Sequence, residues 1–253
     1  MNREIEQFKY DKKRVAEFLH EKVSIIPSLI TSISICFGMQ AFYFILKNRI
    51  EYSILCICIS AIIDGVDGKI ARYLNSTSEF GKTIDSLADF LSFSISPALI
   101  IYIFRLRDWA SLGWSCCVFF VLGMAFRLAR FSSQPSNKES FTGIPAPAAG
   151  LLAFLPIAVE KTFDIVVPNF FFALNLFLIA LGMVGKFKTI AINKIKISKS
   201  FINTFFIAFS IIVVLAMSYI WLTAIAVAII YIIHILVSLY KYKLKRHDQT
   251  ATQ

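Results

Sequence analysis

The sequence predicts an all-α protein, a polytopic bundle of about eight transmembrane helices in one membrane domain. Two observations carry this prediction. Hydrophobic residues fill 57% of the 253 positions and charged residues only 17%, against about 45–50% and about 25% in soluble chains. The apolar residues also fall into stretches of about 20, the length that a helix needs to cross a bilayer. An ordinary soluble domain, a disordered chain and a disulfide scaffold are therefore excluded.

The predicted spans divide the chain into three parts. Residues 1–24 form a charged cytoplasmic segment, 25–240 form the membrane domain, and 241–253 form a basic cytoplasmic tail. Within the first part, residues 4–23 fit an amphipathic helix at the membrane interface, and they fit a solvated charged tail nearly as well. The spans are predicted at 27–46, 50–73, 84–104, 109–131, 146–163, 168–186, 201–218 and 220–240.

Local signals justify the order of these spans. The first apolar stretch lacks an Ala-x-Ala exit, so we expect it to remain as a helix and not to be cleaved as a signal peptide. The fifth and sixth spans are barely separated, by Pro168 and Asn169 at the start of the sixth. With the N-terminus inside, most of the 26 Lys and Arg residues fall on the cytoplasmic side, as the positive-inside rule requires. Both termini are therefore expected in the cytoplasm. Topology alone explains the net charge of +10, which gives no reason to expect nucleic-acid binding.

Four aspartates lie within the second and third predicted spans, where each costs about 2.5–3.5 kcal/mol at mid-bilayer. Asp64 and Asp67 share one helix face, and Asp85 and Asp89 share another. Both pairs fall near the cytoplasmic ends of adjacent antiparallel helices, so we expect them to converge. Intramembrane carboxylates indicate a functional site, and hard oxygen ligands suit Mg²⁺, Mn²⁺ or Ca²⁺. The alternative is that the carboxylates pair with Lys or Arg and only hold helices together.

Small and basic residues accompany the carboxylates. The small ones let a helix or a bulky ligand approach the backbone closely. They are Gly65, Gly68, Ala71 and Gly81. Arg72 and Lys82 are cations suited to a diphosphate. The combination predicts a site for a divalent metal and a diphosphate.

Eight residues at fixed spacing form the motif Asp64-x2-Asp67-Gly68-x2-Ala71-Arg72-x8-Gly81-x3-Asp85-x3-Asp89. This motif resembles the signature of the CDP-alcohol phosphatidyltransferase family, whose members transfer a phosphatidyl or similar group from a CDP-linked lipid to an alcohol and release CMP. The resemblance implies two divalent ions, Mg²⁺ or Mn²⁺, on the four aspartates, with Asp89 as general base. It also implies contacts with the CDP group at Thr31, Gly68, Ala71, Arg72, Ser78 and Gly81. Lys82 is added to these contacts because it is a cation next to Gly81.

Three further stretches resemble the phosphatidylserine synthase branch of that family. They are IDSLADFLSFSISPALIIY at 84–102, FRLARFS at 126–132 and FTGIPAPAAG at 141–150. The branch implies CDP-diacylglycerol and L-serine as substrates, phosphatidylserine and CMP as products, a homodimer, and an active site that faces the cytoplasm from a bacterial-type cytoplasmic membrane. Arg127 or Arg130 is expected to bind the serine carboxylate or a lipid phosphate. Ordinary positive-inside anchoring explains these two arginines about equally well.

Other functions stay open on the sequence. A sister enzyme, such as a phosphatidylglycerophosphate or phosphatidylinositol-phosphate synthase, shares the same aspartates and differs in its acceptor. A UbiA-like prenyltransferase also uses intramembrane Asp and Mg²⁺, but its Asn-x3-Asp-x3-Asp motif is absent and Asp85-x3-Asp89 matches only in part. A cation transporter would explain the acids and leave Gly68 and Arg72 without a role.

Overall fold

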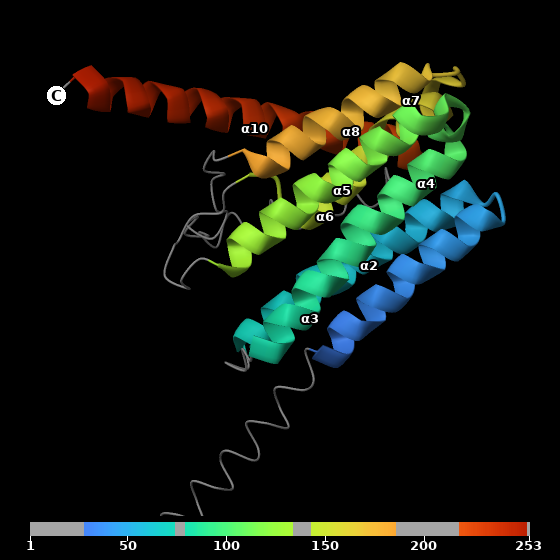
Figure 1. The fold of residues 1–253 in the computed structure, drawn as a ribbon, viewed down its shortest axis with the longest axis horizontal. Helices are drawn as coiled ribbons and strands as arrows, with labels where there is room; N and C mark the ends of the chain where they lie inside the picture. The colour runs from blue at the N-terminus through green and yellow to red at the C-terminus, as the bar shows by residue number, and fades with distance from the viewer. Residues whose placement is uncertain (1–27, 74–78, 134–142, 186–217, 252–253) are drawn as a thin grey trace, which may run out of the picture. The chain divides into compact units, whose positions relative to one another are not determined.

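Helices make up the regular secondary structure of the part of the chain that the structure, a computed structural model, describes (Figure 1). The described residues are 28–73, 79–133, 143–185 and 218–251. The chain forms two compact units, which are divided between Ser96 and Pro97.

The first unit begins with two helices joined by a short turn. The first helix spans Ser28–Leu46 and helix α2 spans Ile50–Tyr73, close to the predicted spans. Asn48 in the turn has a backbone φ of 56°, a left-handed conformation that asparagine tolerates better than most residues. The chain therefore reverses direction within a few residues.

The third helix begins in this unit, continues past Ser96 and contains a π-turn. Helix α3 (Glu79–Phe90), the π-helix η1 (Leu91–Ile95) and helix α4 (Ser96–Phe104) follow each other without a break and form one span of 26 residues. The predicted span began only at residue 84, so the structure extends the helix by more than one turn toward its N-terminus.

Interhelical hydrogen bonds show how the first helix and α2 run. Thr31 bonds to Asp67, and Ser34 bonds to Ser60 further along the first helix. Residue numbers thus rise along the first helix while those of its partners on α2 fall, which means that the two helices are antiparallel.

The first helix and the helix that carries η1 run in the same direction. Ser92 donates a hydrogen bond to the carbonyl oxygen of Ser34, and Ser96 donates one to the carbonyl oxygen of Gly38. Both numbers rise by four from one contact to the next, so the partners are one turn apart on each helix.

The second unit is built around a close pair of helices, α5 (Ala110–Ser132) and α8 (Asn169–Val184). A Cβ added at Gly123 would lie 3.1 Å from Ala180, and the rings of Phe119 and Phe177 stack with their centroids 5.0 Å apart. Small residues thus let the helix backbones approach, as is usual in membrane bundles. The short 3₁₀ helix η2 (Leu106–Trp109) precedes α5. The unit also contains α6 (Ala146–Ala153), α7 (Leu155–Phe163) and α10 (Ile220–Ala251).

The predicted span 146–163 is broken into α6 and α7 at Phe154. Pro156 has no amide hydrogen, and its ring conflicts with the carbonyl group four residues earlier, at Leu152. The side-chain amide of Asn175 donates hydrogen bonds of 3.1 Å to the carbonyl oxygens of Leu152 and Ala153. A side chain of α8 therefore satisfies the backbone groups that the break releases.

An ion pair lies inside the second unit. Two guanidinium nitrogens of Arg105 contact the carboxylate of Glu160: Nη2 lies 2.8 Å from Oε1, and Nε lies 3.3 Å from Oε2. The backbone N–H of Val167 also donates to Oε1. Glu160 is buried, so its charge is compensated by a bidentate partner and a further donor.

Five of the described helical segments are long and apolar enough to cross a membrane. Helix α2 has the length but carries Asp64 and Asp67, and α8 is apolar but has only 16 residues. The predicted interfacial helix 4–23 and the predicted span 201–218 lie outside the described residues. Helix α10 continues to Ala251, so the helix extends into the segment 241–253 that was expected as a tail.

Candidate active site

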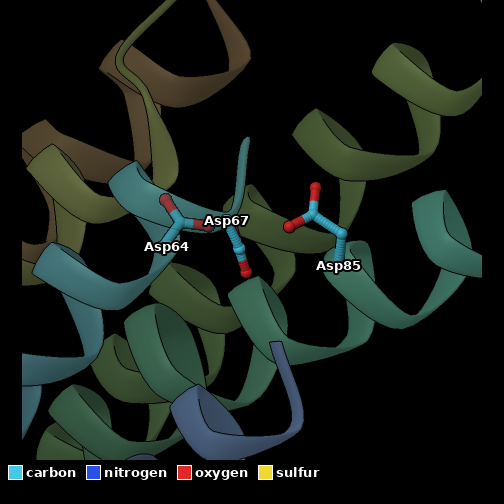
Figure 2. A group of neighbouring side chains, drawn as sticks. All are labelled: Asp64, Asp67 and Asp85. Carbon is cyan, nitrogen blue, oxygen red and sulfur yellow. The ribbon is translucent and has the colours of Figure 1, made fainter. Parts of the chain in front are cut away.

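Three of the four predicted aspartates come together in the first unit. Asp64 and Asp67 lie three residues apart on α2, and Asp85 lies in the second turn of α3. Each offers a carboxylate oxygen, and these oxygens all lie within 4.8 Å of one another. Figure 2 shows the group, with two carboxylates from one helix and one from the other. Three of the four carboxylates that were expected to converge thus lie together.

Asp67 is the buried member of the group, with 3% of its surface exposed. Its Oδ2 accepts a hydrogen bond of 2.8 Å from the hydroxyl of Thr31 on the first helix. Its Oδ1 is buried and has no hydrogen-bond partner among the described residues. Buried oxygens are rarely left in this state, and an unsatisfied carboxylate oxygen beside two other carboxylates fits a metal ligand.

The charges in the group need compensation. Two ionised carboxylates at this separation repel each other by about 3 kcal/mol at an effective dielectric constant of about 20. Within the described part of the chain, no Lys or Arg forms an ion pair with Asp67 or Asp85. Among the described side chains, to which that of Arg72 does not belong, basic groups therefore do not neutralise these two acids. Hard oxygen donors in this number suit a divalent cation such as Mg²⁺ or Mn²⁺.

Asp89 lies one turn beyond Asp85 on α3, a rise of about 6 Å, and it is not part of the group of three. It is partly buried, and one residue, Phe90, separates it from the π-helix η1. Its predicted roles, metal ligand and general base, stay predictions.

Glycines on α2 leave an open side next to the carboxylates. A Cβ added at Gly65 or Gly68 would meet no described atom within 4 Å. Packing against a described helix is therefore not what favours glycine at these positions. The open space at both glycines agrees with room for a ligand close to the helix backbone.

The remaining predicted CDP contacts lie at the ends of α2 and α3. Ala71 and Arg72 belong to the last turn of α2, and Gly81 and the exposed Lys82 belong to the first turn of α3. The side chains of Ala71 and Arg72, and the whole of Ser78, fall outside the described residues. Thr31 is the exception in position, because it lies on the first helix and contacts the metal-ligand candidate Asp67 directly.

Arg127 and Arg130 lie in the last turns of α5, in the second unit. Arg130 donates a hydrogen bond of 3.1 Å to the carbonyl oxygen of Met183, in the last turn of α8. A cation near the C-terminus of a helix is favoured by the helix dipole, so Arg130 has a structural contact. Arg127 contacts the sulfur of Met124 at 4.0 Å. The predicted role of either arginine in binding the acceptor stays a prediction.

Comparison with known proteins decides the family. The profile described as CDP-alcohol phosphatidyltransferase matches residues 24–184, more than half of the chain and all of the carboxylate motif. The chain belongs to the CDP-alcohol phosphatidyltransferase family. Among the members of this family, the chain is similar to curated proteins from several bacteria and an archaeon.

These relatives share one name. The CDP-diacylglycerol–serine O-phosphatidyltransferase of Mycobacterium tuberculosis is 36% identical over 148 residues, which cover 56% of this chain and 51% of the relative. The proteins of the same name from Helicobacter pylori and Bacillus subtilis are 35% and 30% identical, over 57% and 51% of this chain and over 62% and 73% of their own lengths. The chain thus spans about half the length of the mycobacterial relative.

Proposed function

We propose that this protein transfers the phosphatidyl group of CDP-diacylglycerol to L-serine, giving phosphatidylserine and CMP. The observation that carries the proposal is the group formed by Asp64, Asp67 and Asp85, in a chain that belongs to the CDP-alcohol phosphatidyltransferase family. The relatives' printed name supports serine as the acceptor. The same chemistry with another acceptor, glycerol 3-phosphate or inositol phosphate, is the alternative.

In this proposal the carboxylates hold Mg²⁺ or Mn²⁺, with Asp89 completing a site for two ions. Bound divalent metal would offset the negative charge of the diphosphate and of the departing CMP. Asp89 takes the proton of the serine hydroxyl while that oxygen forms a bond with the β-phosphorus of CDP-diacylglycerol. The bond from this phosphorus to the bridging oxygen breaks, and the oxygen leaves as part of CMP.

The side chains around the carboxylates serve the nucleotide in this proposal. The open side of α2 at Gly68 admits the CDP group close to the backbone. Arg72 and Lys82 supply positive charge to its phosphates, and Ala71, Gly81 and Ser78 line its path, with Thr31 behind Asp67. Arg127 or Arg130 binds the serine carboxylate or a lipid phosphate.

We propose further that the protein lies in a bacterial-type cytoplasmic membrane, as a homodimer whose active site opens to the cytoplasm. The lipid chains then stay in the bilayer while serine and CMP exchange with the aqueous phase. The uneven distribution of Lys and Arg along the chain supports this orientation.

The test is CMP release by detergent-purified protein given CDP-diacylglycerol and Mn²⁺ or Mg²⁺, with and without L-serine. We expect release that depends on serine and on the metal. Asp89→Asn should lower the rate by about 10²–10⁴-fold, the contribution of a general base. Asp108→Asn makes the same change at an exposed position of η2 and should leave the rate unaltered.

Other outcomes separate the alternatives. Release with glycerol 3-phosphate or myo-inositol 3-phosphate, and none with serine, would keep the phosphatidyl transfer and reject the acceptor. Folded protein that releases no CMP with any acceptor would overturn the proposal. Full activity of Asp89→Asn would remove Asp89 from the role of base.

A further inference from the structure

Three buried serines from different helical segments are linked by hydrogen bonds in the interior of the first unit. We call Ser34, Ser60 and Ser92 the serine layer. All three are at most 1% exposed. They lie on the first helix, on α2 and on the π-helix η1, the elements that hold or follow the carboxylate group.

Ser34 is the common partner of the other two. Its hydroxyl shares a hydrogen bond of 2.6 Å with the hydroxyl of Ser60, whose oxygen also lies 3.3 Å from the Ser34 carbonyl oxygen. Ser92 donates a hydrogen bond of 3.2 Å to the same carbonyl oxygen. Through Ser34, the first helix thus bonds to both α2 and η1 at the same height along its own axis.

The contact with η1 is close as well as polar. A Cβ added at Gly38 would lie 2.6 Å from the hydroxyl oxygen and 3.1 Å from the Cα of Ser92, so only glycine fits without a shift. One turn later, Ser96 donates a hydrogen bond of 2.9 Å to the Gly38 carbonyl oxygen. The segment that contains the π-turn is therefore held at two successive turns of the first helix.

The serine layer and the carboxylates occupy matching faces of their helices. Ser60 precedes Asp64 by four residues and Asp67 by seven, and Ser92 follows Asp85 by seven. These spacings return to the same side of a helix, with seven residues rising about 10 Å. A rotation or shift of α2 or α3 that moved the carboxylates would have to break the hydrogen bonds of the serine layer.

We infer that the serine layer is a positioning device that sets the register and rotation of α2 and α3, and thereby holds Asp64, Asp67 and Asp85 at metal-binding separation. Between helices in a membrane, hydrogen bonds and close packing provide the association that the hydrophobic effect provides in water. Metal ligands need placement within about 0.5 Å, which requires support from the groups behind them. The inference rests on the proposed function, because it assigns the group of three carboxylates to a divalent metal.

The test measures metal binding without turnover. Detergent-purified protein is titrated with Mn²⁺ alone, and free Mn²⁺ is followed by electron paramagnetic resonance. Ser60→Ala and Ser92→Ala each remove one link and are expected to weaken Mn²⁺ binding by about tenfold, as changes behind metal ligands do. Ser53→Ala is the matched control. Ser53 is a fully buried serine of α2 whose hydroxyl bonds within its own helix region, to the Arg49 carbonyl oxygen, and its loss should leave Mn²⁺ binding unchanged.

A second readout separates positioning from general stability. Serine-dependent CMP release by Ser60→Ala and Ser92→Ala should recover to near the original rate at saturating Mn²⁺, which a loss of folded protein would not allow. If the two variants bind Mn²⁺ like the unaltered protein, the inference is overturned and the proposed function stands. It is equally overturned if Ser53→Ala weakens binding as much as they do, or if both variants only lose folded protein. If the unaltered protein binds no Mn²⁺, both the inference and the metal site of the proposed function are overturned.

Discussion

Thr31 holds one oxygen of Asp67 through a buried hydrogen bond of 2.8 Å. Without this donor, Oδ2 of Asp67 is free to rotate away from the other two carboxylates. We predict that Thr31→Ala weakens Mn²⁺ binding by about tenfold. Thr31→Ser keeps the hydroxyl and should retain most of the affinity. The measurement is the same Mn²⁺ titration by electron paramagnetic resonance, made without substrate.

Thr83 provides the control for this change. Its hydroxyl donates to the Glu79 carbonyl oxygen within α3, and Thr83→Ala should bind Mn²⁺ normally. The family resemblance assigns Thr31 to the nucleotide instead. A Thr31→Ala protein with a raised KM for CDP-diacylglycerol and unaltered Mn²⁺ binding would contradict our prediction and support that role.

Three members of the carboxylate group follow from the sequence, and the separate position of Asp89 does not, because only part of this geometry is local. Asp64 and Asp67 share a helix face by spacing alone, and the opposite directions of successive spans bring Asp85 toward them. The hydroxyl partners are different. Which carbonyl oxygen Ser92 meets depends on the level at which two helices lie side by side, and spacing within one helix does not contain that information. The common face of Asp85 and Ser92 was a signal, but it did not name Ser34.

At the scale of elements, composition predicts where helices begin and end, but it does not predict irregular turns inside them. The first helix and α2 begin and end within one residue of their predicted spans, because apolar stretches and turn residues mark them. The π-turn η1 and the break at Phe154 lie inside stretches that are apolar throughout. Pro156 was visible as a helix breaker in the predicted span 146–163. Its compensation by Asn175 requires contact between α6 and α8, which only the fold supplies.

Asn175 should therefore contribute to stability through its hydrogen bonds to the carbonyl oxygens at the break. We predict that Asn175→Leu lowers the free energy of unfolding by about 1–3 kcal/mol, because two buried carbonyl oxygens lose their donor. Pro156→Ala restores an amide hydrogen near the Leu152 carbonyl group, so the same change should cost less in that background. Unfolding by sodium dodecyl sulfate, followed by circular dichroism, measures both. Equal losses in the two backgrounds would show that Asn175 acts through packing and not through the break.

At the scale of the whole molecule, the sidedness of the C-terminus depends on one stretch. Seven of the eight predicted spans coincide with helices of the structure, and 201–218 lies outside the described residues. If that stretch and the other seven predicted spans all cross the membrane, the number of crossings is even and both termini lie on one side. The basic residues after Tyr240 favour the cytoplasm for the end of α10.

We therefore predict that green fluorescent protein fused after Gln253 is fluorescent, and that alkaline phosphatase fused there is inactive, as for any cytoplasmic end. Alkaline phosphatase fused after Asp108, between the third and fourth predicted spans, should be active because that turn is expected outside. The two fusions report the two sides in one host and control each other. Phosphatase activity at both positions would mean that 201–218 does not cross the membrane. The positive charge after Tyr240 would then lie on the outer face, against the positive-inside rule. Inactivity at both would instead reverse the predicted orientation of the first three spans, and with it the cytoplasmic side of the carboxylate group.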